Sequence, residues 1–268
     1  AAAAAIRVQL TAVNGLLTLS TIAGLNFSGG VGDGVDDSSM SFTGSLAAVN
    51  AALEGLRFVS ATDFFGAATL TITANDLGNT GTGGPLADTD TISISVTSVN
   101  DPPRTAPLPR TILEDNSLTL AIASLIVNDT PGPANEAGQT LAFSGVDPQS
   151  ANGGTVVVQG TNVIYTPPLN FPFTSPVPVS DTFTYILTDN GTTNGISEPK
   201  SARGTVTVTV NPVNDAPTAV NDSYTMDEDS VLTRAAFNGV RANDTDPEGS
   251  QLTVSRISGP TATGSTLG

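Results

Sequence analysis

Apolar and small polar residues alternate with a period of two through much of the chain. The alternation is clearest over residues 205–210, where three valines alternate with three threonines. This period predicts strands that turn one face to a core and the other to water. The 27 glycines and 18 prolines separate such stretches, as turns separate the strands of a β-sandwich.

One segment follows a different period. Leu46, Val49, Leu53 and Leu56 recur at helical spacing, and Ser45 precedes them as a potential N-cap. We therefore expect a single short helix that crosses between two sheets. The predicted fold class is all-β, with tandem β-sandwich domains of about 110 residues each.

Two long segments of the chain resemble each other. Residues 91–103 match residues 205–217, and their Asn-Asp pairs begin at Asn100 and Asn214, so the period is 214 − 100 = 114 residues. A second pair of segments has the same period, because Glu114-Asp115 recurs as Glu228-Asp229. A fixed period of this length indicates repeated domains.

The period divides the chain into three parts. Residues 1–101 are predicted to be a β-sandwich that lacks its beginning, since no Glu-Asp opening precedes Ile6. Residues 102–215 are predicted to be a complete sandwich, and residues 216–268 the first half of a further repeat. We expect the natural protein to be much longer.

These motifs resemble the cadherin-like tandem repeats of large bacterial surface proteins. The resemblance lies in the Val-Asn-Asp-x-Pro linkers at 99–103 and 213–217, the Glu-Asp-x-x-Leu openings at 114–118 and 228–232, and the run 42–56. It implies an immunoglobulin-like sandwich, Ca²⁺ at the domain junctions and a role in adhesion, biofilm formation or surface filaments. True cadherins carry a longer linker motif, Asp-x-Asn-Asp-Asn, which is absent here.

Carboxylates gather around the two linkers in the expected strand order. If the last strand of each sandwich ends at a linker, the loop before the preceding strand lies there too, and the next unit adds its opening. Ca²⁺ takes six to eight oxygen ligands. The candidate ligands at the first junction are Asp63, Asn100, Asp101, Glu114, Asp115 and Asp189. Those at the second junction are Asn214, Asp215, Glu228, Asp229 and, if the opening strand runs the full height of the unit, Asp129. Glu248 is expected at a later junction.

A plainer interpretation of these residues stays open. Asn-Asp before proline is a common turn former, because Asn and Asp side chains hydrogen-bond to nearby main chain and proline fixes φ. Acidic surface residues also keep proteins soluble without binding an ion.

The charge and composition exclude several classes of function. Nine Lys and Arg against 25 Asp and Glu give a net charge of −16, which disfavours nucleic acid and anionic membranes and favours a cationic partner such as Ca²⁺. The chain has no His and no Cys, so it has neither a Ser-His-Asp or Cys-His site nor a usual zinc site. No apolar stretch approaches the ~20 residues that cross a bilayer. We predict no enzyme activity and no membrane insertion in this segment.

The sequence favours a structural or adhesive repeat segment of a long extracellular, cell-surface protein, with Ca²⁺ stiffening the interdomain junctions. Its expected partners are neighbouring repeats of the same chain and an unidentified surface or matrix ligand. Two alternatives stay open. The chain could be a subunit that polymerises into a surface filament or sheath by lending a strand to another copy, or a carbohydrate-binding module of a secreted enzyme. Tight packing between copies would favour the former, and a concave aromatic face the latter.

Overall fold

The computed structural model describes residues 4–27, 31–78, 82–172, 177–235 and 238–254. Its contacts divide the chain into two compact units. The first comprises residues 1–104, 130–142 and 188–202, and the second comprises residues 105–129, 143–187 and 203–268. Strands predominate in the described residues, which confirms the predicted all-β fold.

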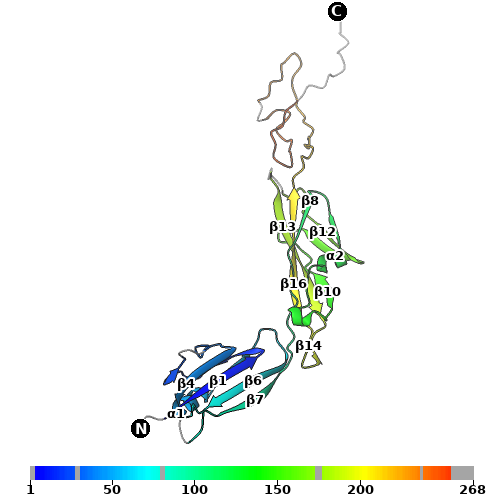
Figure 1. Cartoon of the computed structure of the whole chain (residues 1–268). Coiled ribbons are helices and arrows are strands. Elements are labelled where there is room, and N and C mark those ends of the chain that lie inside the picture. The colour runs from blue at the N-terminus through cyan, green and yellow to red at the C-terminus, as the bar shows by residue number, and fades with distance from the viewer. Residues whose placement is uncertain (1–3, 28–30, 79–81, 173–176, 236–237, 255–268) are drawn as a thin grey trace, which may run out of the picture. The chain divides into compact units, whose positions relative to one another are not determined.

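The first sandwich, residues 5–96, is built on a five-stranded antiparallel sheet in the order β3-β4-β1-β6-β7 (Figure 1). Its strands are β1 (Ala5–Val13), β3 (Leu25–Asn26), β4 (Ser39–Ser45), β6 (Gly66–Asn75) and β7 (Ala87–Val96). A second sheet pairs β2 (Gly15–Thr18) with β5 (Arg57–Ser60). Gly66 of β6 pairs with Val96 of β7, so β6 begins where β7 ends, as the sequence predicted.

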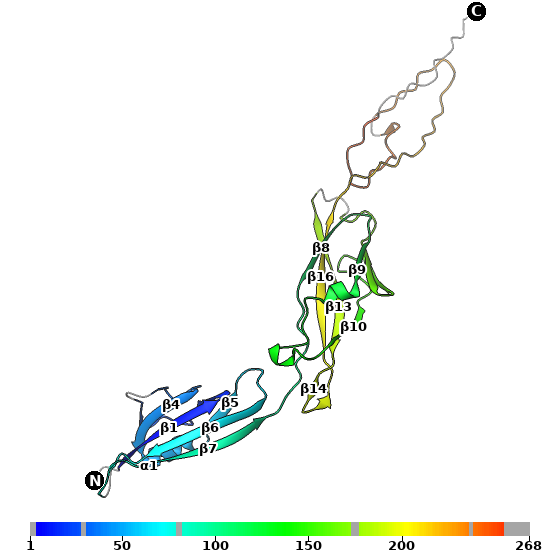
Figure 2. The same cartoon turned by 45° about the vertical axis from the view of Figure 1, so that its right-hand side comes forward.

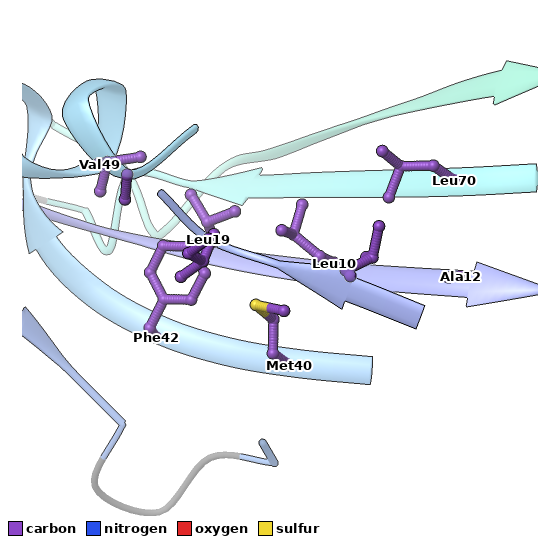
Figure 3. Packing of buried hydrophobic residues seen from close by; sticks show 10 residues of the cluster. Leu10, Ala12, Leu19, Met40, Phe42, Val49 and Leu70 are labelled. Carbon is purple, nitrogen blue, oxygen red and sulfur yellow. The ribbon is translucent and has the colours of Figure 1, made fainter. Parts of the chain in front are cut away.

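The core of the first sandwich lies between these two sheets and the helix. Figure 3 shows Leu10 of β1, Met40 and Phe42 of β4, and Leu70 of β6 pointing toward one another. Buried side chains occupy every second position of these strands, and polar residues, most of them serine or threonine, lie between them. Burial of such apolar faces is the main stabilising term of a sandwich.

The predicted helix is present as α1 (Leu46–Leu53). The Ser45 hydroxyl caps it by accepting a hydrogen bond from the main-chain N–H of Ala48. The helix connects β4 of the large sheet to β5 of the small one, as expected. Val49 is buried whereas Leu46 is 59% exposed, so the apolar face begins one turn later than the sequence pattern suggested.

The second sandwich, residues 108–211, also has two sheets. The larger has the order β10-β13-β16-β8 and the smaller the order β11-β12-β9. Their strands are β8 (Leu108–Leu113), β9 (Leu118–Ala121), β10 (Leu141–Val146), β11 (Thr155–Gln159), β12 (Asn162–Thr166), β13 (Val179–Asp189) and β16 (Ser201–Asn211), and a small hairpin pairs β14 (Thr192–Thr193) with β15 (Ile196–Ser197). The first and last of these seven longer strands, β8 and β16, lie side by side and run parallel (Figure 2).

The core of the second sandwich follows the period of two seen in the sequence. Phe183, Tyr185 and Leu187 of β13 are buried, and so are the three valines of β16. The Tyr185 hydroxyl donates to Asp129 Oδ2 at 2.8 Å, so this polar tip is satisfied inside the sandwich. These tyrosine and phenylalanine rings therefore belong to the core of the second sandwich.

The second sandwich contains two further short helices that the sequence did not indicate. The α-helix α2 (Ile122–Ile126) follows β9, and the 3₁₀ helix η1 (Ala134–Glu136) precedes β10. The expectation of a single helix was wrong, because apolar runs as short as 120–127 fit a strand and a helix equally well. Among the described residues, no helix is long and apolar enough to span a membrane.

In the described residues beyond Asn211 the chain has no strand. An isolated antiparallel bridge joins Thr218 to Thr245. Residues 255–268, the end of the predicted third repeat, lie outside the described residues.

Candidate cation site at the repeat linkers

The first linker, residues 97–107, is fixed by a fully buried asparagine. The Asn100 side-chain amide donates to Asp189 Oδ1 and to the carbonyl of Glu198, both at 2.9 Å. Its carbonyl accepts from Gln139 Nε2 at 2.8 Å, and its main-chain N–H donates to the Thr193 hydroxyl at 3.0 Å. All these residues belong to the first compact unit. The amide uses both its donor and acceptor capacity, which a solvated turn asparagine would not need.

Asp189 is buried because it lies two residues after Leu187, on the inward-facing side of β13. Its Oδ1 also accepts from the main-chain N–H groups of Gly191 and Lys200, each at 2.9 Å. A Cβ at Gly191 would lie 1.7 Å from Asn100 Oδ1, so this approach requires glycine. Asp189 Oδ2 is buried and has no hydrogen-bond partner among the described residues.

Glu136 brings a second buried carboxylate to the first linker. Its Oε1 accepts from the main-chain N–H of Asp101 at 2.9 Å, and the residue is 6% exposed. Its Oε2 and the side-chain oxygen of Gln139 are buried without partners in the described chain. A buried polar atom without a partner costs about 1–3 kcal/mol, so such atoms need an explanation such as an ion or a water molecule.

The second linker, residues 212–217, shows the same arrangement in part. The main-chain N–H of Asp215 donates to Glu248 Oε1 at 3.3 Å, and that of Val213 donates to Glu114 Oε1. Each of these three carboxylates, Asp215, Glu248 and Glu114, keeps one buried oxygen without a partner in the described residues. Burial, with a smaller effect from the carboxylates of Asp246 and Asp215, raises the pKa of Glu248.

The two linkers repeat three contacts in the structure. In the first, the N–H of the linker aspartate donates to a glutamate. In the second, Asp129 accepts from the Ala106 N–H at 2.8 Å, as Asp244 does from the Val220 N–H at 2.8 Å. In the third, a bridge joins Arg104 to Thr130 and its counterpart joins Thr218 to Thr245. The separations, 218 − 104 = 114 and 245 − 130 = 115, match the sequence period.

Residues 214–268 match the family model of the bacterial Ig domain. The second sandwich reproduces the contacts with which this bacterial Ig domain begins, and its two sheets carry the all-β topology. Together these findings confirm the predicted immunoglobulin-like tandem repeat.

Solved structures of a mouse and a human protein also align with the chain. Repeats EC22-24 of mouse cadherin-23 align over 75% of this chain and 53% of that chain, with 16% identity and a TM-score of 0.29. Repeats EC1-2 of human mucin-like protocadherin align over 75% and 85%, with 15% identity and a TM-score of 0.27. The chain spans about half the length of the cadherin-23 fragment. No curated protein matches the sequence. The assignment to Ig-like repeats rests on the family match and the topology.

The structure places two predicted ligands at the other linker. Glu114 and Asp115 were expected beside Asn100, but β8 runs parallel to β16 and therefore ends where β16 ends, beside the second linker. Glu114 contacts Val213 there. Asp115 Oδ1 accepts from the Asn170 N–H at 3.2 Å. The prediction was wrong because alternation with a period of two shows which face of a strand is buried, but not which strand lies beside it in the sheet.

Asp129 was expected at the second linker, but the structure places it close to the first. One carboxylate oxygen of Asp129 accepts from Ala106, just after the first linker, and the other accepts from Tyr185. Both oxygens therefore act within the second sandwich. Asp63 lies near the first linker as expected, with its carboxylate 3.6 Å from the guanidinium of Arg104.

The remaining predicted ligands are solvent-exposed. Asn214 donates to the carbonyl of Asp215 at 3.2 Å, which is the local contact of a turn. Glu228 and Asp229 are exposed, and Asp229 has a φ of 58°, in the left-handed region that aspartate tolerates. Among the described residues, no group of three or more Asp, Glu, His or Cys side chains is close enough to hold a metal.

Two glutamates accept the hydrogen bonds of the linker aspartates, although neither was predicted at these linkers. Glu136 was not considered, and Glu248 was assigned to a later junction, whereas it contacts Asp215. A signal was available, because both are followed by glutamine three residues later, at Gln139 and Gln251. The motif Glu-x-x-Gln thus occurs at this position both in residues 214–268 and in the second sandwich.

Proposed function

We propose that this chain is a structural or adhesive segment of a long extracellular surface protein, in which Ca²⁺ bound at the linkers stiffens successive Ig-like repeats. One observation carries the proposal. At both linkers the aspartate N–H binds a glutamate of the following repeat, and the second oxygen of that glutamate is buried without a partner in the described residues. Such oxygens are the ligands that a hard cation such as Ca²⁺ favours.

The proposed ligands differ from the set read from the sequence. At the first linker they are the unpartnered oxygens of Glu136, Asp189 and Gln139, and at the second those of Glu114, Asp215 and Glu248. Main-chain carbonyls and water would complete the six to eight oxygens of a Ca²⁺ site. Weak binding is expected, in the range of about 10⁻⁴–10⁻³ M that is typical of extracellular modules.

The bound ion would supply positive charge where the protein has buried negative charge. Asn100 acts as the positioning residue, because it joins Asp189 to Gln139 and so holds the two elements that carry them. Without the ion, repulsion between the carboxylates and their desolvation oppose the ordered linker. Loading outside the cell would therefore stabilise a repeat array after export.

Neither an enzyme nor a carbohydrate-binding module is favoured. The rings of Tyr165, Tyr185 and Phe183 are buried in the second sandwich, so they form no sugar platform. Phe65 is the one aromatic side chain among the described residues that is largely exposed, at 48%. A sugar platform generally needs several exposed rings, and catalysis would have to proceed without His or Cys.

Thermal unfolding in millimolar Ca²⁺ and in EGTA, with isothermal titration calorimetry, tests the proposal. Tyrosine fluorescence reports mainly on the second sandwich, because Tyr165 and Tyr185 lie in it, Tyr224 lies beyond it, and the first sandwich has no tyrosine. We expect Ca²⁺ to stabilise the wild type and Glu136→Gln to remove most of that effect. Asp63→Asn is the matched control, since Asp63 faces Arg104. Equal unfolding in Ca²⁺ and EGTA would contradict the proposal.

A further inference from the structure

A short hairpin lies against the first linker. Residues 191–198, which we call the strap, contain β14 and β15 and turn at Asn194 and Gly195. The φ angles of these two turn residues are 51° and 76°, and Asn-Gly with two positive φ angles is a favoured two-residue turn of a β-hairpin. The main-chain N–H of Glu198 donates to the carbonyl of Gly191 at 2.9 Å and closes the base of the strap.

The strap has little apolar burial of its own. Its one large apolar side chain, Ile196, is 73% exposed. Thr193 is half-buried, and the other residues of 192–198 are exposed. A two-stranded hairpin is at best marginally stable in water, and segments with few buried apolar contacts open at a low free energy. The order of the strap therefore depends on its polar contacts.

These polar contacts join the strap to the linker. The Thr193 hydroxyl accepts from the Asn100 N–H at 3.0 Å, and the Asn194 N–H donates to the carbonyl of Ser98 at 3.0 Å. The carbonyl of Glu198 accepts from the side-chain amide of Asn100 at 2.9 Å. All these residues belong to the first compact unit. The strap thus holds the main chain of residues 98–100 on its closed side.

Asp189 connects the strap to the proposed cation site. Its Oδ1 accepts from the N–H of Gly191, where the strap begins, and from the N–H of Lys200, just after the strap ends. Its Oδ2 is the buried oxygen that we assign to the cation. The two oxygens belong to one planar carboxylate, so an orientation that presents Oδ2 to a ligand also presents Oδ1 to the base of the strap. The order of the strap and the order of this ligand are therefore coupled.

We infer that the strap closes on the linker when the cation binds and opens when it leaves, so that closure orders residues 98–100. This inference rests on the proposed function. In the closed arrangement, which the structure describes, Asp189 and Glu136 are 4% and 6% exposed, and the desolvation of their charges opposes closure. Positive charge at their free oxygens offsets this cost. The hydrogen bonds of Thr193 and Asn194 then hold the linker in place.

Hydrogen–deuterium exchange of the whole 268-residue chain tests this coupling, with calorimetry on the same sample to give Kd for Ca²⁺. We compare EGTA with a free Ca²⁺ concentration about ten times Kd. Amides of residues 191–198 should exchange about tenfold more slowly in Ca²⁺, because binding to the closed strap alone favours closure by that factor. The exposed turn between β11 and β12, residues 159–162, should exchange alike in both solutions.

Gly195→Ala tests the strap through its backbone. A Cβ at Gly195 would meet nothing within 4 Å, so the substitution acts only through the φ of 76°. Alanine is disfavoured there, and we expect the affinity for Ca²⁺ to fall about fivefold. Gly160→Ala is the matched control, because Gly160 turns the β11–β12 hairpin with a φ of 59° and equally open surroundings. It should bind Ca²⁺ like the wild type.

Thr193→Val tests the strap through its contact with the linker. It removes the acceptor of the Asn100 N–H, and we expect the affinity for Ca²⁺ to fall about fivefold. Thr192→Val is the control, since this exposed side chain makes no hydrogen bond to another described residue and should leave the affinity unchanged.

The outcomes separate the strap from the proposed function. Ca²⁺ binding by the wild type without slower exchange of residues 191–198 overturns the strap and leaves the proposed function standing. So does wild-type affinity in both Gly195→Ala and Thr193→Val. A wild type that binds no Ca²⁺ overturns both proposals.

Discussion

The two linkers have the same motif but different surroundings. Both begin with Asn-Asp, and in both the aspartate N–H binds a glutamate. At the first linker Asn100 is fully buried and joins Asp189 to Gln139, whereas Asn214 at the second linker is exposed and bonds only to the neighbouring carbonyl of Asp215 among the described residues. The motif alone therefore does not define the site.

The end of the penultimate strand makes the difference. Asp189 closes β13 at the first linker, and Gly191 leaves space for the asparagine beside it. No described residue plays this part for Asn214. Among the described residues, the buried arrangement therefore depends on Asp189 and Gly191 as well as on the Asn-Asp pair.

The largest expected effect comes from the two asparagines. Asn100→Ala leaves Gln139 Nε2 and the Glu198 carbonyl without their partner, and we expect a loss of about 3 kcal/mol from the free energy of unfolding of the second sandwich. Asn214→Ala should change it by less than about 0.5 kcal/mol. Urea unfolding followed by tyrosine fluorescence measures both. Equal losses would show that the two linkers are alike.

The repeated aspartates should differ in the same direction. Asp129→Ala removes the acceptor of both the Ala106 N–H and the buried Tyr185 hydroxyl, and we expect a cost of about 2 kcal/mol. Asp244→Ala removes the acceptor of the exposed Val220 N–H and should cost about 0.5 kcal/mol. Tyr185→Phe identifies the hydroxyl contribution, and in the Tyr185→Phe background the cost of Asp129→Ala should fall.

Calcium should also affect the two linkers to different degrees. At a free concentration about ten times Kd, Ca²⁺ should add about 1.4 kcal/mol to the stability of the wild type. Glu136→Gln is expected to remove most of this gain and Glu248→Gln a smaller part, because Glu136 and Asp189 are buried whereas Glu248 is only partly buried. Calorimetric titration of the two variants with Ca²⁺ shows which linker contributes more to binding. A larger loss from Glu248→Gln would make the second linker the main site.

The smallest effect is expected from the surface ion pair near the first linker. Arg104 is 65% exposed and Asp63 34% exposed, at a separation of 3.6 Å. Exposed pairs of this kind contribute about 0.2–1 kcal/mol, so Arg104→Ala should lower stability by less than about 0.5 kcal/mol. High salt should abolish the difference between this variant and the wild type. A cost as large as that of Asn100→Ala would assign the order of the linker to this pair.

The sequence predicted the features that depend on local pattern. Alternation identified the buried valines of β16, Ser45 marked the start of α1, and the 114-residue period identified the repeated linkers. It could not predict that β8 pairs in parallel with β16, because the alternation of residues along a strand is the same whichever strand lies beside it. Glu114 and Asp129 were therefore placed at the wrong linkers. Glu136 was missed because it lies in a short 3₁₀ turn, which has no periodic pattern.

The parallel pairing of β8 and β16 also has a mechanical consequence. The two strands leave the second sandwich at opposite ends, so a pull on the flanking linkers would slide them past each other and load all their hydrogen bonds together. In such shear, several bonds must break at once, which takes more force than opening them one after another. The second sandwich should therefore resist tension applied along these two strands.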